Sequence, residues 1–194
     1  MTCFLGLTGS IGMGKSTTAG MFTELGCPVW DADAAVHRLY QGPAVQAVET
    51  AFPGTTGPAG VDRQALKAAL AADPAALKRL EAIVHPLVAA DRAAFRAHVT
   101  APLAVLDIPL LFETGADAEM DATAVVSAPA DIQRQRVLAR GTMTAQQLDL
   151  ILSRQMPDAE KRARADYIIP TNDMDSARKA VRAIYAELTG QPDA

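Results

Sequence analysis

The segment GLTGSIGMGKST, residues 6–17, contains a glycine-rich pattern typical of phosphate-binding loops. Gly9, Gly14, Lys15 and Ser16 occupy the fixed positions of G-x-x-x-x-G-K-S. Glycines let backbone N–H groups converge on phosphate oxygens, and the positive end of the following helix points at the same oxygens. In such a loop the lysine reaches the β and γ phosphates, and the serine hydroxyl binds Mg²⁺. The alternative, a glycine turn beside a surface lysine, needs a coincidence expected in about one of a hundred such sequences. The pattern therefore predicts a nucleotide site.

Carboxylates suited to phosphoryl transfer follow two apolar segments of the chain. Asp31 and Asp33 follow Pro28-Val29-Trp30, and Asp107 ends the apolar run 103–107. Transfer to an alcohol needs a group that accepts the hydroxyl proton, so one acid of the pair would be this base. The other would cap the following helix, and Asp107 would lie near Mg²⁺. Two alternatives stay open: both acids of the pair act only as helix caps, and Asp107 is only a turn residue.

A basic segment lies between residues 134 and 164. It holds seven Arg and Lys residues against three acidic ones, a local charge of 7 − 3 = +4 in a chain of net charge −4. Arginines on a mobile lid can neutralise the charge of a transferring phosphoryl group and exclude water. Arg140 is the best candidate because a hinge is expected at the adjacent Gly141-Thr142. For each basic residue, the alternative is an ordinary solvated helix face.

The elements that must position these motifs follow from apolar runs and turn residues. Buried strands are expected at residues 2–8, 28–30, 103–107, 123–127 and 167–169. Helices are expected at 15–25, ended by Gly26, and at 34–40, 131–140, 144 to about 155, and 174–189. Thr144 and Gln147 form a capping box for one of them. This alternation predicts an α/β fold with a parallel sheet, whose ligands bind at the carboxyl ends of the strands.

A helical insertion is expected at residues 62–100, beside the sheet. Asp62 and Asp73 are suited to cap helices there, and Pro74 follows at a first helical position. Pro86 is expected to divide the later helix at His85. Residues 52–60, FPGTTGPAG, carry several turn signals and are expected to form a loop.

Composition limits the possible functions of the chain. Its 194 residues suit one domain, and an apolar fraction of 49% can build a sizeable core. The net charge of −4 argues against a general nucleic-acid binder. Two cysteines, Cys3 and Cys27, suit reduced thiols of a cytoplasmic protein. No signal peptide or transmembrane run is expected, so the prediction includes no membrane partner.

Over essentially its whole length, the sequence resembles the dephospho-CoA kinase family. The resemblance is carried by residues 6–17, by DAD at 31–33, by HPLV at 85–88, by DIPLLFETG at 107–115 and by RQMPDAEKRARADYII at 154–169. The last two segments are far more specific than the phosphate loop. The resemblance implies a three-layer P-loop fold with a five-stranded parallel sheet flanked by helices, a helical acceptor insertion and a lid. It implies that ATP, with Mg²⁺, phosphorylates the ribose 3′-hydroxyl of dephospho-CoA, which gives coenzyme A and ADP.

The resemblance also implies roles for individual residues. Asp33 would be the general base, and Lys15 and Arg140 would stabilise the transferring group. Ser16 and Asp107 would hold Mg²⁺. The nucleotide would be bound by Gly9, Ile11, Gly12, Met13, Gly14, Lys15, Ser16 and Thr17. The acceptor would be bound by Asp33, His85, Leu110, Leu111, Phe112 and Glu113, although His85 has the alternative role of ending a helix before Pro86.

On this interpretation the chain is one kinase domain with three parts. Residues 1–33, 101–130 and 165–194 form the nucleotide-binding core, residues 34–100 the acceptor subdomain and residues 131–164 the lid. The sequence departs from the family pattern at Ser10, where a glycine is usual, and a positive φ there would be strained. The turn 170–173 is out of register, so no adenine contact is assigned to it.

Two other functions fit parts of the sequence. Another small P-loop kinase, acting on a nucleoside monophosphate or a metabolite alcohol, would look alike but would not explain the segments at 107–115 and 154–169. A non-catalytic nucleotide switch should carry D-x-x-G and N-K-x-D, which are absent here. The expected partner is a small-molecule substrate, and the expected state is a monomer or weak homo-oligomer.

Overall fold

The computed structural model describes residues 1–191. The chain divides into two compact units: Met1–Trp30 with the chain from Val99 onward, and Asp31–His98. The first unit contains the sheet, and the second is built almost entirely of helices. No helix within the described residues is both long enough and apolar enough to span a membrane.

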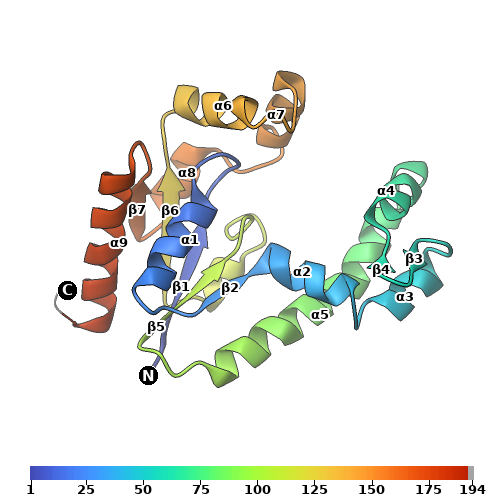
Figure 1. Cartoon of the computed structure of the whole chain (residues 1–194), viewed down its shortest axis with the longest axis horizontal. Helices are drawn as coiled ribbons and strands as arrows, with labels where there is room; N and C mark the ends of the chain where they lie inside the picture. The colour runs from blue at the N-terminus through green and yellow to red at the C-terminus, as the bar shows by residue number, and fades with distance from the viewer. Residues whose placement is uncertain (192–194) are drawn as a thin grey trace. The chain divides into compact units, whose positions relative to one another are not determined.

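The first unit is built on a five-stranded parallel sheet with β1 at its centre (Figure 1). The strands lie in the order β2 (Val29–Asp31), β5 (Leu103–Asp107), β1 (Cys3–Thr8), β6 (Ala122–Ser127) and β7 (Tyr167–Pro170). Every residue of β5 and β6 is buried, which explains their continuous apolar sequences. The five strands expected from the sequence are confirmed, with ends that differ by one residue at most. Because the strands are parallel, Thr8 and Asp107 end neighbouring strands at one edge of the sheet.

Helices cover one face of this sheet. In Figure 1, α1 (Lys15–Glu24, blue) and α9 (Met174–Thr189, red) pack side by side, and both contact strands. The core between them and the sheet includes Leu5, Leu7, Phe22 and Val181. The start of α1 at Lys15 and the extent of α9 agree with the prediction. Both helices begin shortly after the carboxyl end of a strand, α1 after β1 and α9 after β7, at the edge of the sheet where the site motifs lie.

The opposite face is covered by the segment that follows β5. A Cβ atom on Gly6 would lie 2.8 Å from Met120 Cγ and 2.9 Å from Leu111 Cδ2, so these side chains pack directly on β1. The same segment contains a short 3₁₀ helix, η1 (Ala116–Glu119). With helices on one face and this segment on the other, the expected three-layer P-loop architecture is confirmed.

Three helices lie between β6 and β7: α6 (Ala130–Ala139), α7 (Ala145–Leu152) and α8 (Asp158–Arg164). The expected capping box of α7 is present, since the Thr144 hydroxyl accepts from Gln147 N–H and the Gln147 side chain accepts from Thr144 N–H. The expectation that this helix runs to about residue 155 was wrong, because it ends at Leu152. The sequence interpretation did not identify α8, which begins after Pro157.

The second unit holds α2 (Ala32–Tyr40), α3 (Val45–Ala51), α4 (Arg63–Ala72) and α5 (Ala76–His98), with a small hairpin of β3 (Thr56–Gly57) and β4 (Gly60–Val61). They enclose a separate core that includes Leu39, Val48, Phe52 and Leu66. Asp62 caps α4 as expected, accepting from Gln64 N–H at 2.9 Å and Ala65 N–H at 3.0 Å. This unit therefore has a core of its own and folds around it.

Three expectations for this second unit were wrong. Pro86 lies inside α5, which continues unbroken from Ala76 to His98, so it does not divide the helix at His85. The stretch 52–60 is not only a loop, because β3 and the start of β4 lie in it. Asp73 accepts from Ala75 N–H at 2.8 Å, but α5 begins only at Ala76. Leu80 and Val84 are buried before the proline, and Leu87 and Val88 pack partly buried against the same core after it, so packing stabilises the helix on both sides of Pro86.

Candidate active site

The glycine-rich loop connects β1 to α1 in the geometry that the sequence pattern requires. Gly12 has a φ of 79° and Gly14 a φ of 87°, backbone angles that residues with a Cβ atom rarely adopt. An added Cβ at Gly9 would overlap Val126 Cγ2. Among the described residues no other type than glycine has a positive φ, so Ser10 carries no such strain. The loop can therefore approach an anion closely with its backbone.

Lys15 forms an ion pair with Asp107, which ends the neighbouring strand β5. The Asp107 side chain is 1% exposed and that of Lys15 15%, so the pair is shielded from water. Ser16 and Thr17 lie in the first turn of α1 and are exposed. Lys15 and Asp107 are 92 positions apart in the sequence, and the sequence analysis assigned both to one site. The structure brings them together.

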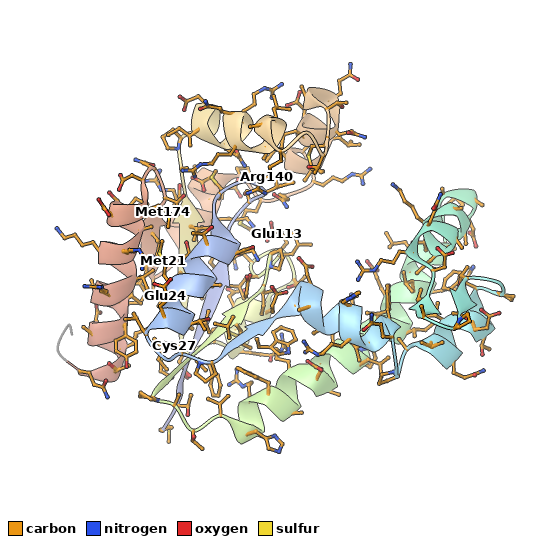
Figure 2. The ribbon with its side chains drawn as sticks, viewed as in Figure 1. Met21, Glu24, Cys27, Glu113, Arg140 and Met174 are labelled. Carbon is orange, nitrogen blue, oxygen red and sulfur yellow. The ribbon has the colours of Figure 1, made fainter. Side chains whose placement is uncertain are left out.

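A cavity of about 320 Å³ opens beside the loop. It is lined by Gly12, Gly14, Thr17, Thr18, Met21, Arg136, Arg140, Thr171, Asn172, Asp173, Met174 and Ala177. Figure 2 labels Arg140 at the end of α6, and Met21 and Met174 on α1 and α9. The cavity combines two arginines with two thioethers, so it offers both charge and an apolar wall to one ligand.

Arg136, which the sequence analysis did not single out, fixes one wall of this cavity. Its Nη2 donates to the carbonyl oxygens of Thr171 at 2.6 Å and Asn172 at 3.3 Å. The Thr171 hydroxyl in turn donates to the carbonyl of Met13, at 2.7 Å, within the phosphate loop. The turn after β7, to which no contact was assigned from sequence, is thereby tied to the loop and lines the cavity.

Glu113, assigned by resemblance to the acceptor site, is held by protein groups. Its Oε1 accepts from Lys161 Nζ at 2.8 Å and from Met156 N–H at 2.9 Å. Lys161 is fully buried, and its Nζ also lies 3.3 Å from Pro109 O. Burial raises the pKa of Glu113, but the hydrogen bonds from Lys161 and Met156 outweigh it and hold that pKa below its ordinary value. Glu113 therefore carries a negative charge that pairs with Lys161.

The neighbours of Glu113 differ in exposure. Leu110 is 41% exposed, whereas Leu111 has no exposed surface and Phe112 is 4% exposed. The Arg164 guanidinium lies 4.8 Å from the centre of the Phe112 ring. Of these apolar side chains, Leu110 alone presents substantial surface to a ligand, while Leu111 and Phe112 anchor the segment to the sheet and to α8.

The remaining predicted site residues belong to the second unit. Asp31 is the helix cap of the pair, because its Oδ1 accepts from Ala34 N–H at 2.8 Å. Asp33 lies in the first turn of α2 with an exposed carboxylate, so it is not used as that cap. His85 is exposed on α5. Of the two acids, one of which was expected to cap the following helix, Asp31 is therefore the cap.

The cysteines are packing groups rather than nucleophiles. Burial raises the pKa of the Cys27 thiol to about 11. Burial, with a smaller effect of the Asp121 charge, also raises the pKa of Cys3. Both thiols stay protonated near neutral pH, and neither lines the cavity beside the loop.

The donor set fits a magnesium ion that is held jointly with a nucleotide. Mg²⁺ binds through one or two protein oxygens together with substrate phosphates and water. The Ser16 hydroxyl and the Asp107 carboxylate are the protein oxygens that the sequence analysis expects to hold it. Within residues 1–191 there is no group of three or more His, Cys, Asp or Glu side chains that would hold a metal ion by itself. The residues therefore suit a metal that arrives with phosphates.

The fold and the loop together define the chain as a P-loop kinase. A crystal structure of a Thermus thermophilus protein has a TM-score of 0.87 and 35% identity over 97% of this chain and 99% of its own. A dephospho-CoA kinase structure from Campylobacter jejuni shares the fold, with a TM-score of 0.71 and 24% identity over 98% of this chain and 99% of that one. The dephospho-CoA kinase family profile matches residues 3–177. A dephospho-CoA kinase of Cereibacter sphaeroides is 59% identical over 192 residues, 98% of each chain. This chain belongs to the dephospho-CoA kinase family.

Proposed function

We propose that this protein transfers the γ-phosphate of ATP to the ribose 3′-hydroxyl of dephospho-CoA, giving coenzyme A and ADP. The observation that carries the proposal is the family match at residues 3–177, in a chain whose phosphate loop and Arg140 line one cavity. The activity requires Mg²⁺, which would be held by Ser16 and Asp107 and would neutralise phosphate charge. A cytoplasmic location and a monomer or weak homo-oligomer belong to the same proposal.

The nucleotide is held by the phosphate loop and the cavity beside it. Backbone N–H groups of the loop 9–17 cradle the phosphates, and Lys15 leaves Asp107 to contact the β and γ phosphates. Arg140 meets the negative charge that spreads over the transferring phosphoryl group. Met21 and Met174 give an apolar wall suited to a heterocyclic base.

The acceptor would be activated from the second unit. Asp33 accepts the proton of the 3′-hydroxyl as the oxygen attacks the γ-phosphorus, and ADP leaves with its charge neutralised. Its exposed carboxylate, free of the capping role of Asp31, supports this assignment. The acceptor subdomain, residues 34–100, contributes His85, and Leu110 offers apolar contact. The exposure of Leu110 favours it over Leu111 for this contact.

An ADP-release assay with MgATP tests the proposal, comparing dephospho-CoA with AMP, adenosine and shikimate as acceptors. We expect release that depends on dephospho-CoA, with coenzyme A as product. Release with AMP alone would assign the protein to the nucleotide kinases. ATP binding without release for any acceptor would favour a nucleotide switch.

A further inference from the structure

Ile11, near the tip of the phosphate loop, is held by two glutamine side chains from outside the loop. Gln133 Nε2 donates to the Ile11 carbonyl oxygen at 2.7 Å. Ile11 N–H donates to Gln155 Oε1 at 3.4 Å. Gln133 is 5% exposed, so its bond is protected from water, whereas the longer bond of Gln155 is the weaker one. We name this arrangement of Ile11, Gln133 and Gln155 the glutamine clamp.

The two glutamines of the clamp lie on either side of Arg140 in the sequence. Gln133 lies in α6, and Gln155 lies between α7 and α8. The chain between them carries Arg140, the C-cap residue of α6, whose backbone is still helical. Gln133 and Arg140 are seven residues apart, close to two helical turns, and so lie on the same side of α6. On one face of α6, Gln133 therefore contacts the loop and Arg140 lines the cavity beside the loop.

Packing of α6 on the loop adds to this contact. An added Cβ on Gly12 would overlap Val137 Cγ2 and lie 3.2 Å from Gln133 O. Val137 lies between Gln133 and Arg140 on the helix. The helix and the loop thus touch without a gap, and a shift of one moves the other.

The other end of the segment is fixed as well. Met156, which follows Gln155, donates its N–H to Glu113 at 2.9 Å. Asp158 Oδ2 accepts from Ser127 Oγ at 2.8 Å, which holds the start of α8 on β6. The clamp therefore joins the loop to a segment whose far end is anchored to the sheet.

We propose that Gln133 and Gln155 are positioning residues that hold Arg140 in place against the phosphate loop. Neither glutamine lines the cavity beside the loop. Gln133 acts through the placement of α6, and Gln155 acts through the chain that follows α7. The proposal rests on the proposed function, because Arg140 is assigned there to the transferring phosphoryl group. It also predicts weaker binding of MgATP alone, which does not depend on the acceptor.

The test compares Gln133→Met with Gln135→Met, an exposed glutamine on the same helix, each in the natural and the Arg140→Ala background. Methionine keeps the length of the side chain and removes its hydrogen bonds. We expect Gln133→Met to lower kcat about tenfold in the natural background, the equivalent of about one net hydrogen bond. In the Arg140→Ala background the same change should lower kcat less than about twofold, because the residue it positions is gone. Gln135→Met should change neither.

Equal losses in the two backgrounds would overturn the proposal, because a residue that only supports folding acts whether Arg140 is present or not. An unchanged kcat would overturn it too. If Gln133→Met does not fold, Gln155→Met carries the same comparison, with an expected loss of about threefold for its longer bond. If the natural protein makes no coenzyme A, the proposed function fails, and MgATP affinity tests the clamp. Gln133→Met should then bind MgATP about fivefold more weakly, and equal affinity would overturn the clamp.

Discussion

Replacing Lys161 with methionine is expected to destabilise the first unit by about 3 kcal/mol at pH 7. The substitution removes the cation 2.8 Å from Glu113 Oε1 and leaves that carboxylate with 17% of its side chain exposed. Loss of one partner from a buried pair costs about 3–5 kcal/mol, and the remaining exposure of Glu113 favours the lower end. For a chain of this size, a fall in melting temperature of about 6–12 °C follows.

The size of the effect should depend on pH, in a direction that Glu113 sets. In the natural protein its pKa is held below the ordinary value of about 4.3, so the pair stabilises the fold above that pH. This stabilisation is lost as the pH falls through the folded pKa. Without Lys161, burial still raises the pKa of Glu113 and only backbone hydrogen bonds, chiefly that from Met156, still lower it. The pKa of Glu113 in the variant is therefore higher than in the natural protein, and the cost of the unpaired carboxylate is relieved as the carboxyl takes up a proton. The difference between the two proteins should be largest at pH 7 and shrink towards pH 4.

Urea unfolding followed by circular dichroism, at pH 7 and pH 4, measures this difference. The double variant Lys161→Met/Glu113→Gln removes both charges and keeps an acceptor for Met156 N–H, so most of the stability should return. Lys179→Met, an exposed lysine of α9, is the matched control and should stay within about 0.5 kcal/mol. A loss below about 1 kcal/mol at pH 7, or a double variant no more stable than the single one, would refute the reasoning.

Three further substitutions address the active site. Asp33→Asn is expected to lower turnover at least about 100-fold with MgATP affinity nearly unchanged. ADP release and nucleotide binding measure the two, and retained turnover would assign the base elsewhere. Asp107→Asn should raise the Mg²⁺ concentration for half-maximal ADP release about tenfold, and an unchanged magnesium curve would remove Asp107 from the metal site. Gly12→Ala should abolish measurable MgATP binding in calorimetry, because φ is 79° and the added Cβ would overlap Val137. Gly20→Ala, with no atom within 4 Å of its added Cβ, should bind normally, and binding by Gly12→Ala would contradict the steric argument.

The sheet and the phosphate loop could be predicted because their signals are local. The continuous apolar runs of β1, β5 and β6 and the glycines that require positive φ leave few other conformations. The placement of Lys15 and Asp107 at one edge of the sheet also followed, since parallel strands end at one edge, but their ion pair was not predicted. These features need no knowledge of how distant side chains pack.

Other features depend on tertiary packing and left no local signal. Lysine is almost never fully buried unless paired, so the sequence analysis counted Lys161 only among the basic residues of the segment 134–164 and did not predict an internal ion pair. Pro86 favours a helix end, yet the packing of Leu80 and Val84 before it and of Leu87 after it outweighs that preference. Gln133 and Gln155 are ordinary polar residues in sequence, and only the approach of α6 and of the turn after α7 to Ile11 gives them a role.

The ion pair between Lys15 and Asp107 affects which anions the loop can accept. An anion that takes Lys15 away from Asp107 removes the cation beside a carboxylate that is 1% exposed, which is costly unless another cation replaces the lysine. Inorganic phosphate or uncomplexed triphosphate brings no such cation, whereas a magnesium-complexed nucleotide brings the anion and the cation together. The loop thus discriminates between these ligands through an exchange of counter-ions, independently of any contact with the nucleotide base.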